Sequence, residues 1–129
     1  LKRSIIMTDF TFQRGGIYLA NLNPNKGNEP GKLRPVLVVQ HDWLNSISHP
    51  TIIVLPLTTV LFDDAHPLRS RVSERHKLNL DSDILCDQIR SIDVRRLIPE
   101  CLTKLTIEEM NVIQEQLKLI LNLSIKPRS

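Results

Sequence analysis

Two apolar runs of strand length constrain the fold more than any other feature of the sequence. Residues 35–39 read PVLVV, and residues 51–57 read TIIVLPL. Their β-branched side chains favour strands, and the lack of a polar break indicates strands that are buried on both faces. Both runs are far shorter than the ~20 apolar residues of a membrane-spanning helix. The sequence therefore predicts a buried β-core, with no membrane as a partner.

Further short segments have the pattern of strands, and a longer segment has that of a connecting loop. Residues 23–32 (NPNKGNEPGK) combine Asn, Pro, Gly and charge without periodicity, which is typical of a loop. A loop of this length in a small domain often carries function. The polar residues 41–50 connect two strands. The predicted strands cover residues 16–22, 34–40, 51–59 and the alternating segment 67–74, and residues 82–94 form one or two more.

The C-terminal part of the chain has the pattern of an amphipathic helix. Thr106 and Glu109 have the spacing of a capping box, and Pro127 marks a stop. The side chains that would share one helical face are Ile107, Met110, Ile113, Leu117 and Ile120 or Leu121. Several short strands followed by one helix predict a mainly β (α+β) fold, in which the helix covers a small, strongly bent sheet or barrel.

Length and composition indicate one domain. The chain has 129 residues, of which 41% are hydrophobic, and this suits a single core. We expect a flexible leader at residues 1–13, one domain at 14–124 and a tail at 125–129. No signal-peptide pattern is visible, so Cys86 and Cys101 are expected to stay reduced in a cytoplasmic protein. A formal charge of +3 mildly favours an anionic partner.

The sequence has no pattern that points to a metal or a cofactor. The four histidines, at 41, 49, 66 and 76, lack metal-ligand spacing, and neither cysteine belongs to a C-x-x-C pair. There is no P-loop, no G-x-G-x-x-G and no G-x-S-x-G. We therefore expect no metal site and no cofactor.

Arginines are the candidate functional residues. Arg34 stands at the start of a rigid strand, because Pro35 favours an extended backbone at the residue that precedes it. Arg34 is therefore either a positioned cation that binds an anion or a solvated residue at the strand end. Arg69 and Arg71 would project from the same strand face, where they could bind phosphate or guard a solvated edge. Arg90, Arg95 and Arg96 alternate with Asp87 and Asp93, which favours local salt bridges.

A family resemblance rests on several of these segments together. They are RGGIYLANLNPNKGNEPGKLRPVLVVQ, then VLPLTT, then ILCDQIRSIDVRRL and the final helix. Over residues 14–123 the chain resembles the MazF/PemK/Kid toxins of toxin–antitoxin modules. The resemblance implies a small SH3-like barrel, a homodimer, and metal-independent, sequence-specific cleavage of single-stranded RNA that a cognate antitoxin blocks.

The resemblance also implies roles for particular residues. Arg34 and Thr58 match the catalytic arginine and threonine, Glu29 matches a loop glutamate near the active site, and Asp87 matches an acidic residue with a base role in the plasmid-borne subgroup. The basic residues expected to contact RNA are Lys32, Arg69, Arg71 and Arg90. The chain departs from that subgroup at Asn28 and Leu85, where the subgroup has histidine and arginine, and from the wider family at Pro30, where Gln is common.

Two other functions fit the same sequence. A CcdB-like toxin shares this fold and binds gyrase without cutting RNA, although such a binder has no need of the Arg34 and Thr58 pair. A plain RNA-binding module would hold phosphates on its basic face without chemistry. A cleavage assay separates both from a ribonuclease.

Overall fold

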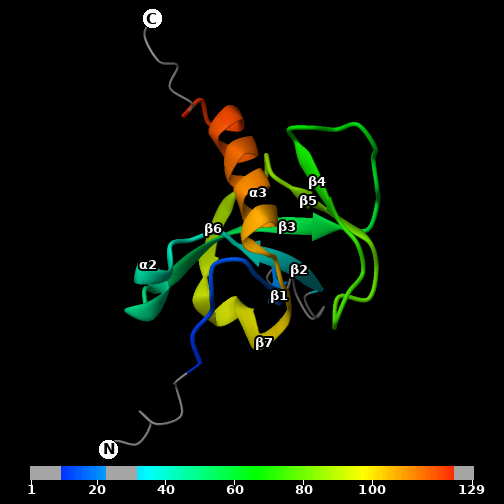
Figure 1. Ribbon diagram of the computed structural model, residues 1–129. Helices are drawn as coiled ribbons and strands as arrows, with labels where there is room; N and C mark the ends of the chain where they lie inside the picture. Colours follow the sequence, from blue (N-terminus) through cyan, green and yellow to red (C-terminus); the bar gives the residue numbers. More distant parts are fainter. Residues whose placement is uncertain (1–9, 23–31, 124–129) are drawn as a thin grey trace, which may run out of the picture.

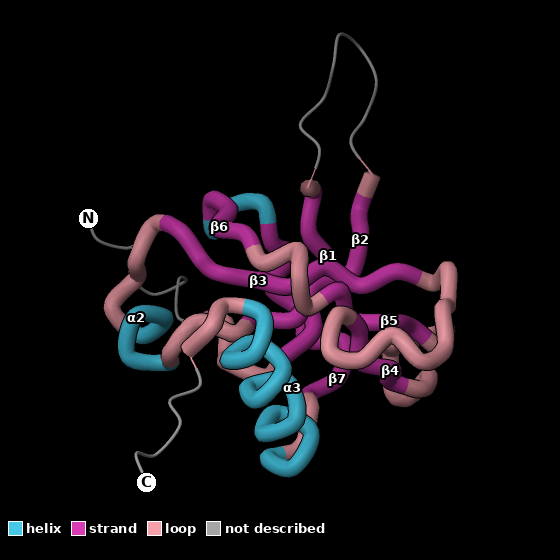
Figure 2. The backbone as a smooth tube through the Cα atoms, turned by 90° about the horizontal axis from the view of Figure 1, so that it is seen from above, coloured by secondary structure: helices cyan, strands magenta, loops and turns pink. Residues whose placement is uncertain are grey.

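The computed structural model describes residues 10–22 and 32–123, which form a bent antiparallel sheet and a C-terminal helix (Figure 1). The strands follow the order β4–β5–β3–β2–β1–β7, and β6 pairs with β3. Figure 2 shows α3 on one side of the bent sheet and β6 on the other. The elements are β1 (Gly16–Asn21), β2 (Leu33–Val38), α2 (Asp42–Ser46), β3 (Thr51–Thr58), β4 (Arg69–Val72), β5 (Ser82–Leu85), β6 (Arg90–Asp93), the 3₁₀ helix η1 (Val94–Arg96), β7 (Leu97–Lys104) and α3 (Ile107–Ile120).

The predicted central strands are confirmed. Within β2, Val36, Leu37 and Val38 are all fully buried, as expected for a strand covered on both faces. β3 lies antiparallel to β2 over this stretch, with Val36 opposite Pro56 and Val38 opposite Val54. The run 82–94 forms two strands, β5 and β6, which pair with different halves of β3.

Three features differ from the sequence-based expectation. The sheet is bent but does not close into a barrel, because no ladder joins β4 to β7 among the described residues; the mainly β class is confirmed. β7 was not predicted, because Pro99, Glu100 and its other exposed residues hide its alternation. The polar connection 41–50 contains the short helix α2, whose start is capped by His41 Nδ1, which accepts a hydrogen bond from the Trp43 amide at 2.8 Å.

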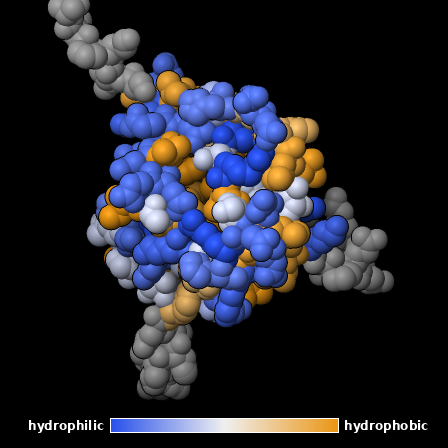
Figure 3. All heavy atoms as spheres, turned by 45° about the vertical axis from the view of Figure 1, so that its right-hand side comes forward, coloured by the Kyte–Doolittle hydropathy of each residue, from blue (hydrophilic) through white to orange (hydrophobic). Residues whose placement is uncertain are grey.

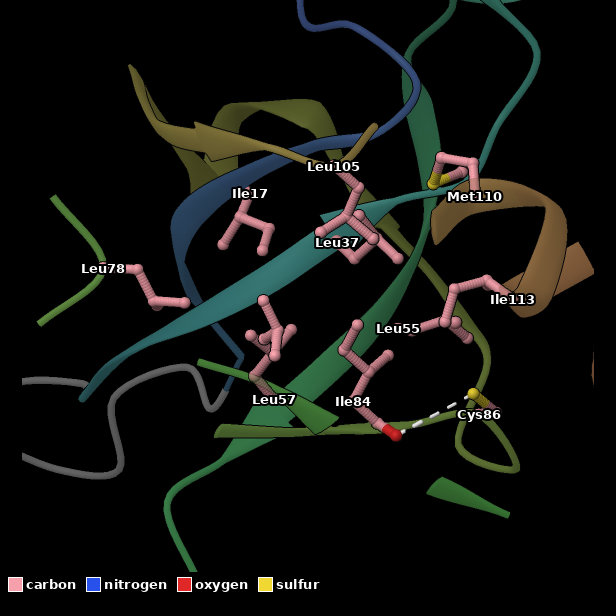
Figure 4. Close-up of a cluster of buried hydrophobic side chains, with 11 residues drawn as sticks. Ile17, Leu37, Leu55, Leu57, Leu78, Ile84, Cys86, Leu105, Met110 and Ile113 are labelled. Carbon is pink, nitrogen blue, oxygen red and sulfur yellow. Dashed lines mark hydrogen bonds between the residues drawn. The ribbon is translucent and has the colours of Figure 1, made fainter. Parts of the chain in front are cut away.

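Two separate apolar cores lie on the two faces of the sheet, because the side chains of each strand alternate between them. The first core lies beneath α3 and is drawn in Figure 4, where Cys86 Sγ also approaches the Ile84 carbonyl oxygen at 3.8 Å. The second core includes Tyr18, Val36, Val54 and Ile92. We call the face that carries this second core the distal face, because it is turned away from α3.

Helix α3 begins at the predicted capping box. Thr106 Oγ1 accepts a hydrogen bond from the Glu109 amide at 3.1 Å, and Glu109 Oε1 accepts one from the Thr106 amide at 2.8 Å. The predicted face is confirmed for Met110 and Ile113, which are buried, and for Leu117 and Ile120, which pack partly buried against the core. It is wrong for Ile107, which is 77% exposed, and the buried face also contains Gln116, which is 1% exposed. Gln116 is accommodated on this face because its amide reaches backbone carbonyls at the outer edge of the sheet.

Gln116 satisfies backbone groups at the outer edge of β4. Its Nε2 donates hydrogen bonds to the carbonyl oxygens of Pro67 at 3.0 Å and Arg69 at 2.9 Å. At the opposite end of the sheet, the Lys77 amide donates to the Leu102 carbonyl oxygen of β7 at 3.0 Å. The outer strands β4 and β7 therefore each have backbone carbonyls at their edges occupied from within the chain.

Part of the expected leader contacts the sheet. Phe12 packs edge-on against Tyr18 at a ring distance of 4.9 Å, and Phe10 packs against Tyr18 at 6.2 Å. The Gln13 amide also donates to the Tyr18 hydroxyl at 3.0 Å. The boundary at residue 14 stays a prediction, but residues 10–13 are packed rather than free. No helix within the described ranges has the length and apolar character needed to cross a membrane.

Candidate functional site

Polar side chains line up across the distal face at the C-terminal end of β3. Thr58 pairs with Asp83 of β5, and Asp83 pairs with Arg71 of β4. Directly paired residues of antiparallel strands project from the same face, with their Cβ atoms ~4.5–5.5 Å apart. Thr58, Asp83 and Arg71 are therefore neighbours in one line.

Arg34 extends this line on the other side of β3. The ladder between β2 and β3 pairs Val36 with Pro56, and the same register continued by two residues brings Arg34 opposite Thr58. Arg34 also pairs with Ala20 of β1. We call Arg34, Thr58, Asp83 and Arg71 the transverse row.

The two predicted catalytic residues have groups available for a ligand. Arg34 is exposed, and no hydrogen bond or ion pair engages its guanidinium within residues 10–22 and 32–123. Thr58 Oγ1 accepts a hydrogen bond from the Val60 amide at 3.1 Å, which leaves the hydroxyl hydrogen free to donate. The arrangement therefore offers a cation and a hydroxyl donor to an anion bound beside the strand ends.

Asp83, which the sequence analysis did not single out, is the most buried charged group of the row. Its side chain is 1% exposed. Oδ1 accepts from Arg71 Nε at 2.6 Å, and Oδ2 accepts from Arg69 NH1 at 3.0 Å and from the Phe62 amide at 2.9 Å. Burial opposes the charged form, but the bonds from Arg71, Phe62 and Arg69 outweigh it and lower the pKa of Asp83. Asp83 is thus a buried carboxylate that remains ionised.

Arg69 and Arg71 do share one face, as predicted, but the chain itself engages both guanidinium groups. Arg71 NH2 pairs with Asp63 Oδ1 at 2.9 Å in addition to its bond with Asp83. Arg69 NH1 also donates to the Val60 carbonyl oxygen at 2.8 Å. These contacts occupy several of the guanidinium donors that would otherwise be free to contact RNA.

An open cavity of about 460 Å³ adjoins these two arginines, lined by the residues 62–66 together with Arg69, Arg71 and Asp83. The Arg69 guanidinium lies 4.5 Å from the centre of the Phe62 ring, in a cation–π contact. Figure 3 shows hydrophilic and hydrophobic surface intermingled on the side of the molecule that this view brings forward. Between β3 and β5, the large apolar side chains that are exposed are Val60, Leu61, Phe62, Leu68 and Leu80.

A second basic group lies where β1 ends. Arg90 NH2 and Arg96 NH1 both donate to the Leu22 carbonyl oxygen, at 3.3 and 3.4 Å. Arg95 instead pairs with Asp93 at 2.8 Å, so the predicted local salt bridge holds for Arg95. Lys32, directly before β2, is exposed.

The other two site candidates lie outside the transverse row. Asp87 is exposed in the turn between β5 and β6, where the Gln88 amide donates to the Leu85 carbonyl oxygen at 3.1 Å. Glu29 lies outside the described residues, as do Asn28 and Pro30. The structure therefore brings Arg34 and Thr58 together and places Asp87 in a separate turn, whereas Glu29 is not among the described residues.

The buried thiol and phenol are unsuited to proton transfer near neutral pH. Burial raises the pKa of Cys86 to about 12, and burial likewise raises the pKa of Tyr18 to about 12. A buried thiol of this kind is chemically inert. Among the described residues, no three His, Cys, Asp or Glu side chains come together as a metal site.

Comparison with known proteins gives a consistent set of relatives. Residues 13–121 match the sequence profile of the PemK-like, MazF-like toxins of type II toxin–antitoxin systems. The chain is 38% identical over 112 residues to "Endoribonuclease MazF" of Staphylococcus saprophyticus, which covers 86% of this chain and 92% of the relative.

Solved structures of similar fold have lower sequence identity. A MazE–MazF structure from Deinococcus radiodurans matches with a TM-score of 0.73 and 22% identity, over 90% of this chain and 100% of the other. The Mycobacterium tuberculosis toxin MazF-mt6 matches with a TM-score of 0.69 and 23% identity, over 85% and 99% of the two chains. These structures agree with the observed fold of a bent sheet and a C-terminal helix.

Proposed function

The chain belongs to the PemK-like, MazF-like toxins of type II toxin–antitoxin systems, and from that premise we propose that it is an endoribonuclease that cleaves single-stranded RNA at specific sequences. The observation that carries this proposal is the juxtaposition of Arg34 and Thr58 at the adjoining ends of β2 and β3. The relative from Staphylococcus saprophyticus, which covers most of the chain, bears the same activity in its name.

RNA supplies its own nucleophile for such a reaction. The 2′-oxygen next to the scissile phosphate bonds to phosphorus, and the bond from phosphorus to the 5′-oxygen breaks. The 2′-hydroxyl loses its proton and the departing 5′-oxygen gains one, which gives a 2′,3′-cyclic phosphate and a 5′-hydroxyl end. The added negative charge at phosphorus is the quantity that the protein has to stabilise.

Arg34 and Thr58 are suited to that charge. Arginine guanidinium groups remain protonated in proteins, so Arg34 acts by stabilising charge and by donating hydrogen bonds, not as a base. The Thr58 hydroxyl donates to a second phosphoryl oxygen. Two donors fixed on neighbouring strand ends need no rearrangement when the charge develops.

The remaining candidates have supporting roles in this proposal. Asp87 and Glu29 are the carboxylates proposed to accept the 2′-hydroxyl proton, and a relay through Thr58 is the alternative route. Lys32 and Arg90 contact the RNA backbone beyond the scissile phosphate, as the resemblance implies. Arg69 and Arg71 line the open cavity beside the transverse row, which we call the groove, although Asp83 and Asp63 offset much of their charge.

The same premise extends to assembly and location. We propose that the protein acts as a cytoplasmic homodimer and that an acidic cognate antitoxin covers the groove that binds RNA. Relatives were solved in complex with antitoxin, among them a mycobacterial endoribonuclease with its cognate antitoxin and the Deinococcus MazE–MazF pair. Guanidinium groups attract carboxylates as well as phosphates, which makes one groove suitable for both ligands.

The test is RNA cleavage by Arg34→Ala beside Arg95→Ala as the matched control. Removing one preorganised donor typically lowers the rate ~10²–10³-fold, and Arg34 is exposed at a strand end, so its loss opens no core cavity. Arg95→Ala removes another exposed guanidinium, from η1, and should cut RNA normally. The wild-type protein should still cleave RNA in the presence of EDTA. It should not cleave a substrate that carries a 2′-deoxy sugar at the scissile position.

Two outcomes would count against this function. Near-normal cleavage by folded Arg34→Ala would remove Arg34 from the mechanism. Purified protein that binds but never cuts RNA, or that binds gyrase, would favour one of the two non-catalytic alternatives instead.

A further inference from the structure

We propose that Asp83 is a positioning residue that acts through Thr58: it holds the segment after Thr58 so that the hydroxyl points at the bound phosphate. This inference rests on the proposed ribonuclease function, and the experiment below separates the failure of one from the failure of the other. Asp83 lies opposite Thr58 in the β3–β5 ladder and is 1% exposed.

Three hydrogen bonds connect Asp83 to the segment that follows Thr58. The Phe62 amide donates to Asp83 Oδ2 at 2.9 Å, and Arg69 NH1 bridges the same oxygen, at 3.0 Å, to the Val60 carbonyl oxygen, at 2.8 Å. The Val60 amide in turn donates to Thr58 Oγ1 at 3.1 Å. Asp83 thereby fixes residues 60 and 62, and residue 60 fixes the direction of the Thr58 hydroxyl.

The charges near Asp83 favour positioning over direct phosphate binding. Arg69 and Arg71 carry two positive charges, and their ion-pair partners Asp83 and Asp63 carry two negative charges. A cluster with no formal net charge draws a phosphate only weakly, whereas a buried carboxylate with three donors is well suited to hold a loop. The cation–π contact of Arg69 with Phe62 adds a further contact to the same segment.

The two roles differ in their dependence on salt and in their coupling to Thr58. A residue that supports phosphate contacts changes the salt dependence of RNA affinity, because fewer counterions are released on binding. A residue that orients Thr58 changes the turnover rate and does not change the salt dependence of RNA affinity. It also has no effect once the Thr58 hydroxyl has been removed.

The experiment is a double-mutant cycle of Asp83→Asn and Thr58→Val, measured by single-turnover RNA cleavage. We expect Asp83→Asn alone to slow cleavage ~10–10²-fold, since a misplacement of ~1 Å can have that effect. In the Thr58→Val background the same change should slow cleavage less than about threefold, because the group it positions is absent. The salt slope for binding a non-cleavable RNA analogue should equal that of the wild type.

Two further variants keep the test decisive. Arg69→Lys removes the guanidinium that connects Asp83 to the Val60 carbonyl oxygen, while Arg71 still pairs with Asp83. If Asp83→Asn fails to fold, Arg69→Lys should show the same result: slower cleavage with the Thr58 hydroxyl present, little slowing in the Thr58→Val background, and an unchanged salt slope. Asp93→Asn is the matched control, because it removes another carboxylate that pairs with an arginine, at the end of β6. This variant should cleave RNA at the normal rate. The positioning role would be overturned if Asp83→Asn slowed cleavage as much in the Thr58→Val background as in the wild type. It would also be overturned if Asp83→Asn reduced the salt dependence of RNA affinity. Wild-type protein that cuts no RNA would instead overturn the proposed function.

Discussion

Replacing Glu109 by Gln should weaken the fold in a pH-dependent way, because this carboxylate joins α3 to the rest of the molecule. Glu109 receives two hydrogen bonds from Arg75, both at 2.8 Å, and one from the Thr106 amide at 2.8 Å. The bonds from Arg75, opposed by partial burial and helped by Thr106, lower the pKa of Glu109 from 4.5 to about 2.

The size of the effect follows from this pKa. Each unit of difference between the folded and unfolded pKa corresponds to about 1.4 kcal/mol, so a fall from 4.5 to about 2 sets a ceiling of about 3 kcal/mol. The side chain is 38% exposed, so solvent screening reduces this to about 1–2 kcal/mol. The unfolded state binds more protons between these two values, so the stabilisation is complete above pH 4.5 and disappears as the pH falls towards 2.

The assay is urea unfolding of wild type and Glu109→Gln at fixed protein concentration between pH 7 and pH 3. We expect the variant to lose about 1–2 kcal/mol of unfolding free energy at pH 7, with the difference narrowing below pH 4.5. Glu115→Gln is the control on the same helix, because its pair with Lys118 is exposed and its change should stay within about 0.5 kcal/mol at every pH. A Glu109→Gln difference that is constant with pH would refute the ionic explanation.

Other predictions address the site, the core and the partners. Thr58→Val keeps the side-chain shape, so it should leave RNA affinity unchanged while slowing single-turnover cleavage ~10²-fold or more; normal cleavage would make Thr58 a packing residue. Ile113→Ala should lower the free energy of unfolding by about 2–5 kcal/mol in urea titrations, because Ile113 is 1% exposed in the core beneath α3, and a loss below about 1 kcal/mol would mean that this core collapses around the gap. Sedimentation at micromolar concentration should show a dimer of the 14.8 kDa chain, and a purely monomeric profile would contradict the homodimer. A non-cleavable RNA analogue should compete with the antitoxin, RNA losing affinity more steeply as salt rises; independent binding of both ligands would refute a shared groove.

The strands that the sequence predicts well are those whose burial is uniform or strictly alternating. The run 35–39 is apolar throughout because the sheet is covered on both faces there, and the capping box at Thr106 is local chemistry that sequence spacing reveals. β7 could not be predicted from its pattern of apolar and polar residues, because four consecutive residues, 98–101, are exposed and include a proline. Its position depends on pairing with β1, which is far away in the sequence.

The candidate site shows a similar division. Arg34 stands out because Pro35 and a buried strand follow it, whereas Asp83 lies in a segment, SDILC, that reads as an ordinary strand. Only the pairing of β5 with both β3 and β4 reveals that Asp83 is buried between Thr58 and Arg71. Sequence alternation correctly placed Arg69 and Arg71 on one face but could not show that their charges are matched within the chain.

The hydrogen bonds of Gln116 bear on how this protein can associate with others. An outer strand with free carbonyls is a template on which another chain can extend a sheet, which leads to aggregation or strand exchange. Here the Gln116 amide occupies the carbonyls of Pro67 and Arg69, and the Lys77 amide occupies that of Leu102 at the other end. Association by strand addition is therefore disfavoured at these positions.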